Sequence, residues 1–189
     1  MIPSSREILS SLYGSWRLAH FDRAGMAYFD RSVDGFWRSF FAALIIAPLY
    51  AVMLGLRYSV AGEPGDPMHY GLIEAISYLI SWFAYPVVMH ALTGLLDCRD
   101  RFVGYIVAYN WSLVLQNAVL VPIAMLNALQ VISPTAAGVL WLIAIVAVLA
   151  YLWFIARVGL AVPPLTAVGI VSIDVLLSLL ISGLTDRLH

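Results

Sequence analysis

The sequence predicts an all-α, polytopic membrane protein in which five transmembrane helices follow an amphipathic N-terminal helix. Of the 189 residues, 62% are hydrophobic and 11% are charged, and the mean hydropathy is +0.92. A soluble domain is about 45–50% apolar and about 25% charged, so a single soluble core would not accommodate this excess. Five apolar stretches are each long enough to cross a bilayer, which requires roughly 20 residues.

The composition also excludes several classes of function. The formal net charge of −1 leaves no basic surface for a nucleic-acid partner. Cys98 is the single cysteine, which excludes an intramolecular disulfide, and the four histidines show no metal-binding spacing. We therefore expect neither a metal nor a cofactor. All ten basic residues are arginine, which together with heavy Ala, Leu, Val and Gly usage indicates a GC-rich bacterial genome.

Residues 1–35 form the first predicted region, an amphipathic segment in the cytoplasm or at its membrane interface. Ser4 and Glu7 have the spacing of a capping box, in which each side chain satisfies a free backbone N–H at a helix start. Apolar residues then recur at helical spacing at Ile8, Leu12, Trp16 and Ala19. Such a helix either lies in the headgroup layer or packs on the bundle, and a third interpretation is a docking surface for a soluble partner.

The tripeptide Phe-Asp-Arg occurs twice before the first span, at 21–23 and at 29–31. We expect both arginines to hold this segment on the cytoplasmic face, and Phe21 and Phe29 to dip into the interface. The intervening acids offset the arginines, so the segment is not the polybasic patch that binds anionic lipids. Asp34 follows as the expected N-cap of the first span.

The five predicted spans make up a transmembrane bundle over residues 36–184. Gly, Pro and charged residues separate them, beginning with AGEPGDP at 61–67. The spans lie at 37–57, 72–96, 102–127, 136–156 and 165–184. Residues 185–189 then form a short tail, which we expect on the outer side of the membrane.

The distribution of arginine predicts the orientation of the chain. A cytoplasmic N-terminus places eight arginines on the cytoplasmic side and two on the other. The cytoplasmic ones are Arg6, Arg17, Arg23, Arg31, Arg38, Arg99, Arg101 and Arg157, and the outer ones are Arg57 and Arg187. Because cytoplasmic loops are enriched in positive charge, we expect a bacterial inner-membrane protein with its N-terminus inside and its C-terminus outside.

The first span carries small residues at every fourth position, namely Ala43, Ala47, Ala51 and Gly55. Small residues let two helices approach closely, and close packing drives helix association where burial of apolar surface no longer does. We expect this small-residue ribbon to form a helix–helix seam, either within the bundle or between two protomers.

Asp174 lies near the middle of the fifth span, where an ionised carboxylate costs at least about 2–3 kcal/mol. It is therefore expected to be protonated, paired or facing a wet cavity. Polar side chains of other spans are its available partners: His90, Asn110, Gln116 and Asn117. Pro48, Pro86 and Pro122 add expected kinks, because proline removes a helical hydrogen bond. These features fit a permeation or proton site, and they also fit a structural cluster in a curved bundle.

Enzyme motifs are missing from the sequence, including GxSxG, a P-loop, paired metal ligands and a Gly-rich phosphate cradle. DCRDR at 97–101 is the one charged constellation. Its Asp97 and Asp100 would in principle hold a metal together with a lipid phosphate. The same residues suit a tight turn between two spans, which is the interpretation we favour. The sequence therefore indicates a protein that is not an enzyme.

The predicted architecture is similar to the Yip family of five-span membrane proteins, which are named for interaction with Rab-type GTPases in eukaryotes and also occur in bacteria. SLYG at 11–14 resembles that family's DLYGP motif, with Ser11 in place of the acid and Ser15 in place of the proline. RFVGYIVAYNWSLVLQN at 101–117 is similar to its Gly-Tyr-bearing third span. The resemblance implies a non-enzymatic protein that organises partners or membrane traffic, and no GTPase-binding residue is carried over.

The preferred interpretation is an integral membrane scaffold or accessory subunit, which binds other membrane proteins or organises the membrane without chemistry of its own. Its partners would be the lipid bilayer and either another membrane protein or further copies of the chain. The alternative is a small transporter or channel that uses Asp174 and the kinked spans. A membrane-embedded lipid enzyme is the third hypothesis.

The arginine distribution predicts opposite locations for the two ends of the chain. In a Cys98→Ser background, the Ser5→Cys variant should resist an impermeant thiol reagent applied outside, because its cysteine lies in the cytoplasm. The Leu188→Cys variant should react with the same reagent. Labelling of intact cells is the measurement, and equal accessibility at both positions would mean that the number of spans is even.

Overall fold

The computed structural model of the chain describes residues 2–60 and 66–188. The chain is 86% helical, with no strand in the described residues. Five helical segments are long and apolar enough to span a bilayer, which confirms the fold class to that extent. The predicted separator at 61–67 falls largely in the segment 61–65, which lies outside the described residues.

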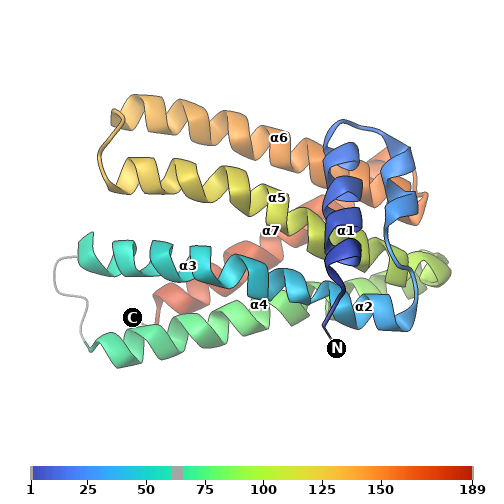
Figure 1. The fold of residues 1–189 in the computed structure, drawn as a ribbon, viewed down its shortest axis with the longest axis horizontal. Coiled ribbons are helices and arrows are strands. Elements are labelled where there is room, and N and C mark those ends of the chain that lie inside the picture. Colours follow the sequence, from blue (N-terminus) through green and yellow to red (C-terminus); the bar gives the residue numbers. More distant parts are fainter. Residues whose placement is uncertain (1, 61–65, 189) are drawn as a thin grey trace.

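The helices follow one another with short connections (Figure 1). They are α1 (Ser5–Ala19), η1 (Arg23–Tyr28), α2 (Val33–Ser39), α3 (Phe41–Val60), α4 (Pro67–Leu95), η2 (Arg99–Arg101), α5 (Phe102–Ala128), α6 (Pro134–Leu160) and α7 (Pro164–Asp186). The five predicted spans correspond to α3 to α7, and each helix begins or ends within a few residues of its predicted bounds. At about 1.5 Å per residue, even α3 reaches about 30 Å, the thickness of the hydrocarbon core.

Helix starts follow local chemistry that is visible in the sequence. Pro67 and Pro134 occupy the first turns of α4 and α6, where proline has no hydrogen bond to lose and its fixed φ suits a helix. The side chains of Asp66 and Ser133 cap these two helices by accepting backbone N–H groups. Ser4 caps α1 in the same way, accepting the amide of Glu7 at 3.2 Å.

The first span differs from the prediction in two respects. Asp34 is not its N-cap, because Ser32 accepts the amide of Gly35 at 3.0 Å and Asp34 lies inside the first turn. The helix is also interrupted at Phe40, between α2 and α3. Here the Ser39 hydroxyl donates to the Phe36 carbonyl at 2.7 Å, a local bond that competes with the regular helical pattern.

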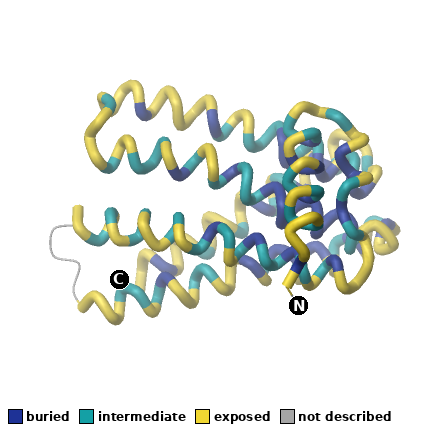
Figure 2. Tube along the Cα trace, viewed as in Figure 1, coloured by how far each residue is buried: buried dark blue, intermediate teal, exposed yellow. Residues whose placement is uncertain are grey.

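α5 is the central helix of the bundle. It packs against α3 and α6, and α7 packs between α6 and α4. Nine successive residues in its N-terminal half are buried, from Gly104 to Ser112. A helix that is buried on every side lies inside a core rather than on its surface. Figure 2 shows that burial is concentrated around this half of α5, and that the other ends of the long helices are largely exposed.

α1 runs across the long helices instead of along them (Figure 1). Its buried face consists of small side chains and one leucine, namely Ser11, Gly14, Ser15 and Leu18, and it contacts α5 and η1. The inner face of α1 is therefore packed on the bundle, as one of the predicted arrangements has it. Of the predicted apolar stripe, Ile8, Leu12 and Ala19 pack against the core beside that face, whereas Trp16 is 55% exposed. Small residues allow the closer approach, which places the aromatic side outward.

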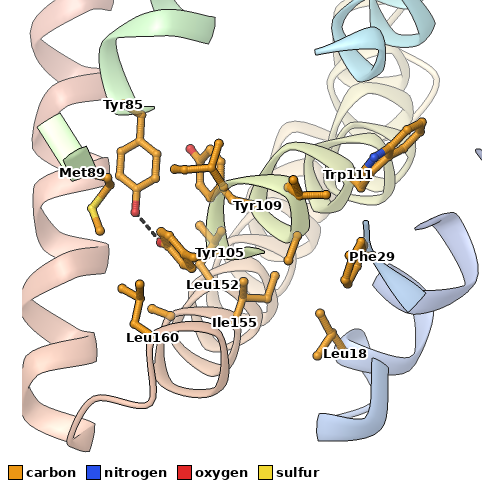
Figure 3. Packing of buried hydrophobic residues seen from close by; sticks show 14 of the residues in the cluster. Leu18, Phe29, Tyr85, Met89, Tyr105, Tyr109, Trp111, Leu152, Ile155 and Leu160 are labelled. Carbon is orange, nitrogen blue, oxygen red and sulfur yellow. Dashed lines mark hydrogen bonds between the residues drawn. The ribbon is translucent and has the colours of Figure 1, made fainter. Parts of the chain in front are cut away.

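The Phe-Asp-Arg repeat has a structural function at this end of the bundle. Asp22 caps η1 by accepting the Ala24 amide at 2.9 Å, and Asp30 accepts the Ser32 amide at 2.9 Å. The amide of Ala24, followed by the guanidinium of Arg17, lowers the pKa of the Asp22 carboxyl. Phe29 is buried instead of dipping into an interface, because it packs in the core beneath α1 (Figure 3).

Arg38 joins the first three elements of the chain. Its guanidinium donates to Glu7 at 2.9 Å and to Asp30 at 2.5 Å. Glu7 therefore binds an arginine, and its carboxylate is not limited to the predicted capping box. Since Glu7 lies on α1 and Arg38 on α2, this ion-pair network holds the crosswise helix to the start of the first span.

The small-residue ribbon of α3 only partly faces its own bundle. Ala43 packs against the core, whereas Ala51 and Gly55 are exposed and nothing lies within 4 Å of a Cβ placed at Gly55. The buried residues of α3 are Ala42 and Ile46, on a neighbouring face. The described residues therefore do not form a seam along the whole ribbon within the bundle, because its second half is exposed. A seam between protomers stays a prediction.

The contact between α1 and η1 depends on two glycines. A Cβ at Gly25 would lie 2.6 Å from the Gly14 carbonyl oxygen, which is closer than real Cβ contacts allow. Gly25→Ala should therefore overpack this crossing and lower stability by about 1–3 kcal/mol. Thermal unfolding in detergent, together with protease sensitivity of α1, is the measurement.

Gly138→Ala is the matched control for this prediction. Gly138 lies in α6, and nothing lies within 4 Å of a Cβ placed there. Alanine favours the helix by about 1 kcal/mol over glycine, so this variant should be neutral or slightly more stable. Equal thermal stability of Gly25→Ala and Gly138→Ala would show that the close crossing of α1 and η1 does not exist.

Candidate functional site

A polar cleft of about 580 Å³ lies between α3, α4, α5 and α7. This volume is within the range of about 300–1,000 Å³ that is typical of small-molecule sites. Its lining includes Arg57 and Asp186, in the last turns of α3 and α7, and Glu74, about two turns into α4, and these three residues mark its mouth. Asp174 lies at its deep end, about 18 Å from Asp186 at the usual helix rise. The cleft therefore reaches from the arginine-poor end to the middle of the bundle.

The walls of the cleft are two helical faces with the same spacing. α4 contributes Glu74, Ser77, Tyr78, Ser81, Trp82 and Tyr85, and α7 contributes Asp174, Leu177, Ser178, Ile181, Ser182 and Thr185. Steps of three and four residues keep each set on one side of its helix. Ser77 and Thr185 join the two helices by a hydrogen bond of 2.6 Å. Because the Thr185 hydroxyl also donates to the Ile181 carbonyl, Ser77 is the donor in this bond.

Asp174 is held at the deep end by one tyrosine. The Tyr109 hydroxyl of α5 donates to Asp174 Oδ1 at 2.8 Å. Asp174 makes no ion pair with the described residues, although it is only 8% exposed. Its second oxygen is left available to the cleft. A buried carboxylate without a cationic partner is costly, so this residue is the strongest candidate for binding a positive charge.

Aromatic side chains line the α3–α4 side of the cleft. The Tyr50 hydroxyl donates to Glu74 at 2.5 Å, and the Tyr78 hydroxyl donates to the Ala43 carbonyl at 2.7 Å. The rings of Tyr50 and Tyr78 lie 4.8 Å apart, and Trp82 continues the series at 6.1 Å from Tyr78. These two hydrogen bonds hold α3 to α4 and orient the aromatic rings at the cleft surface.

Three tyrosines close the cleft toward the arginine-rich end. The ring of Tyr85 stacks on that of Tyr109 at 4.3 Å, and both line the cleft. Behind them, the hydroxyls of Tyr85 and Tyr105 form a hydrogen bond of 2.5 Å (Figure 3). Tyr105 and Met89 are fully buried. The cleft is therefore open at one end of the bundle and closed by packed side chains toward the other.

The structure brings together only part of the predicted polar cluster. Asn117 lines the same cleft as Asp174, with its amide donating to the Leu113 carbonyl. His90 is exposed and lies edge-on to Phe102 at 5.3 Å, so it is not a partner of Asp174.

Asn110 and Gln116 also bind elsewhere. The Asn110 amide donates to the Ser39 hydroxyl at 2.9 Å, where the break between α2 and α3 lies. The Gln116 amide donates to the Ser112 hydroxyl on its own helix at 3.0 Å. Neither residue is therefore the predicted partner of Asp174. Asn110 lies on a different face of α5 from Tyr109, which binds Asp174.

The three prolines lie inside helices that continue past them. Pro48 and Pro122 are exposed, whereas Pro86 is buried in α4. Pro86 leaves the Trp82 carbonyl without its helical donor, and Trp82 is part of the cleft lining. Pro86 is thus the one proline whose freed carbonyl belongs to a residue at the deep half of the cleft.

Sequence reasoning missed the serines and tyrosines of the cleft. The signal was present as Asp174, Ser178, Ser182 and Thr185, at steps of four, four and three residues along one apolar helix. Short hydroxyl side chains are common in membrane helices, so each of them alone carries little information. Taken together, they mark one polar face of α7, which lines the cleft.

The cleft should react with water-soluble reagents in a bilayer. In a Cys98→Ser background in liposomes, Ser178→Cys and Ser182→Cys should be modified by a charged methanethiosulfonate reagent present on both sides. The thiolate is the reactive species, and it forms only where water reaches the sulfur. The rate of modification, read by mass spectrometry, is the measurement.

Leu179→Cys is the control, because Leu179 is exposed on α7 but is not part of the cleft lining. In a bilayer this position faces hydrocarbon and should react slowly. Fast modification of Leu179→Cys would contradict a lipid-facing surface there. Slow modification of both Ser178→Cys and Ser182→Cys would show that the cleft does not hold water.

Comparison with protein-family models, with curated proteins and with solved structures gave no match.

Proposed function

We propose that the chain is a multi-pass membrane protein that binds a small cationic solute in the polar cleft and moves it across the membrane. The proposed orientation follows the arginine distribution, with the N-terminus and the crosswise α1 in the cytoplasm of a bacterium. The polar cleft then opens to the outer side. The observation that carries this proposal is the buried Asp174 at the deep end of an open cleft.

The cost of polar groups in a bilayer supports this reading. Five helices of this chain are apolar enough to span, yet two of them carry serines and carboxylates along one face. Intramembrane ionisable residues occur where they face a bundle interior or a water-filled cavity, and they often mark solute or proton pathways. The serines and carboxylates of these two helices line a cleft of about 580 Å³, which is large enough to hold a small solute.

The tyrosine core beneath the cleft supports transport over a simple pore. Tyr85, Tyr105 and Met89 close the path toward the arginine-rich end. A transporter has a binding site near the middle of the membrane that is open to one side at a time. In the proposed orientation, a cleft that is open at the arginine-poor end is the outward-facing form of such a site.

A scaffold or accessory subunit is the second proposal, and a different observation favours it. Ala51 and Gly55 present a small-residue face of α3 that the described part of the chain does not cover. A helix of another membrane protein, or of a second copy, would pack closely there. This is also the role that the resemblance to the Yip family implies, and it requires no function for the cleft.

Replacing Asp174 separates the two proposals. Asp174→Asn keeps the acceptor for Tyr109 but removes the charge, so the fold should persist and thermal stability should stay equal or rise. Flux of protons, inorganic cations or small organic cations into liposomes should be lost. The measurements are flux under imposed gradients, with pH- and potential-sensitive dyes, and thermal unfolding.

Asp100→Asn is the control for this experiment. Asp100 lies on η2 at the arginine-rich end and its side chain is 78% exposed, so the variant should keep both flux and stability. Absence of flux for the wild type under every gradient would contradict transport and leave the scaffold proposal. Flux that survives in Asp174→Asn would show that the solute does not depend on this carboxylate.

A further inference from the structure

We infer that the polar cleft selects organic ammonium compounds, with the ammonium group at Asp174 and the organic part on the aromatic side of the cleft. This inference rests on the proposed function, since it names the class of solute that the cleft would take.

The charge of the lining selects cations. Three carboxylates line the cleft, on Glu74, Asp174 and Asp186, against one guanidinium, on Arg57. Arg57, Glu74 and Asp186 lie together at the mouth, whereas Asp174 lies alone at the deep end. An anionic solute would meet repulsion along the whole path. A cation gains most beside Asp174, because the charge interaction strengthens as water is excluded.

The aromatic lining selects an organic cation. Trp82 and Tyr85 line the same half of the cleft as Asp174, and Tyr50 and Tyr78 extend the aromatic surface toward the mouth. The face of an aromatic ring attracts a cation, and recognition of ammonium groups by several rings is a common use of this attraction. A cleft that holds a buried carboxylate and is lined by tyrosine and tryptophan side chains therefore fits an ammonium group that carries carbon substituents.

Bare metal ions fit the cleft poorly. In the described residues, no group of three His, Cys, Asp or Glu side chains is placed to hold a metal. The carboxylates are spread along the length of the cleft, and the helix rise separates Asp174 from Asp186 by about 18 Å. A cleft of about 580 Å³ is also far larger than a single ion requires. Hydroxyls of Ser178 and Ser182 offer further contacts to a solute with polar substituents.

The test compares charged probes with an uncharged isostere. Choline, tetramethylammonium and putrescine would be titrated into the purified full chain in nanodiscs by calorimetry. The reference is the carbon isostere of choline, in which a quaternary carbon replaces the nitrogen. At least one charged probe should bind roughly tenfold or more tightly than the isostere, since one buried charge pair and one cation–π contact supply at least that ratio.

Variants assign the binding to the cleft. Asp174→Asn should weaken the charged probe roughly tenfold or more and leave the isostere unchanged, whereas Trp82→Leu should weaken the charged probe without loss of the fold. Asp100→Asn should bind as the wild type does. Trp82→Leu is informative only if its thermal unfolding is cooperative, so Asp174→Asn, which keeps the acceptor for Tyr109, remains the deciding variant.

Three outcomes would overturn the inference. Equal binding of choline and its carbon isostere would show that shape alone is recognised, and binding unaffected by Asp174→Asn would place the probe elsewhere. Failure of all three ammonium probes at millimolar concentration would exclude the class. If the wild type then still conducts protons or inorganic cations in liposomes, the proposed transport function stands. The inference that organic ammonium compounds are its solutes would then be wrong. If both fail, the cleft has no transport function.

Discussion

The packing of the N-terminal half of α5 is the constraint on which the other helices depend. Residues from Gly104 to Ser112 are buried in succession, so each side of this segment meets a different neighbour. Tyr109 faces α7, Tyr105 meets α4, and Asn110 binds Ser39 before α3 begins. These contacts come from successive turns of a single helix. Because Tyr109 lines the deep end of the cleft, the position of α5 also determines where the polar cleft ends.

The chain treats its acidic residues in two ways. At the arginine-rich end, Glu7, Asp22 and Asp30 each bind an arginine, and these bonds order the short elements before the first span. Asp174 has a tyrosine hydroxyl in place of an arginine. An ion pair would have fixed an arginine on Asp174, whereas the single bond from Tyr109 leaves the second carboxyl oxygen open to an exchangeable partner. This contrast is why we interpret Asp174 as a binding residue.

The architecture was predictable because the length and the mean hydropathy of a span each depend on many residues at once. The five apolar segments, the Ser4 cap and the depth of Asp174 all follow from the sequence. The partner of Asp174 did not, because a tyrosine in an apolar helix suggests packing or an interface, and its hydroxyl becomes informative only when α5 and α7 are placed. At the break before Phe40, Ser39 binds the Phe36 carbonyl and also accepts a bond from Asn110, which is 71 residues distant in sequence and which no local pattern contains.

The small-residue ribbon shows a further limit of sequence reasoning. A period of four indicates that a helix has a smooth face, but it does not say which neighbour covers that face. In α3 the neighbouring face, with Ala42 and Ile46, turned inward instead. α1 behaves likewise, since its small residues are buried and Trp16 is outside. In both helices the side chains that permit the closest approach need not be those with the clearest pattern.

The uneven burial along α5 makes the bundle mechanically asymmetric. Nine residues in succession are buried in the N-terminal half of α5, while the other ends of the long helices are largely exposed (Figure 2). Regions with few buried contacts open at lower free energy than the core does. We therefore expect the exposed ends of the helices to separate at lower free energy than the buried ends. The cleft would then widen from its mouth while the packing around the N-terminal half of α5 is kept.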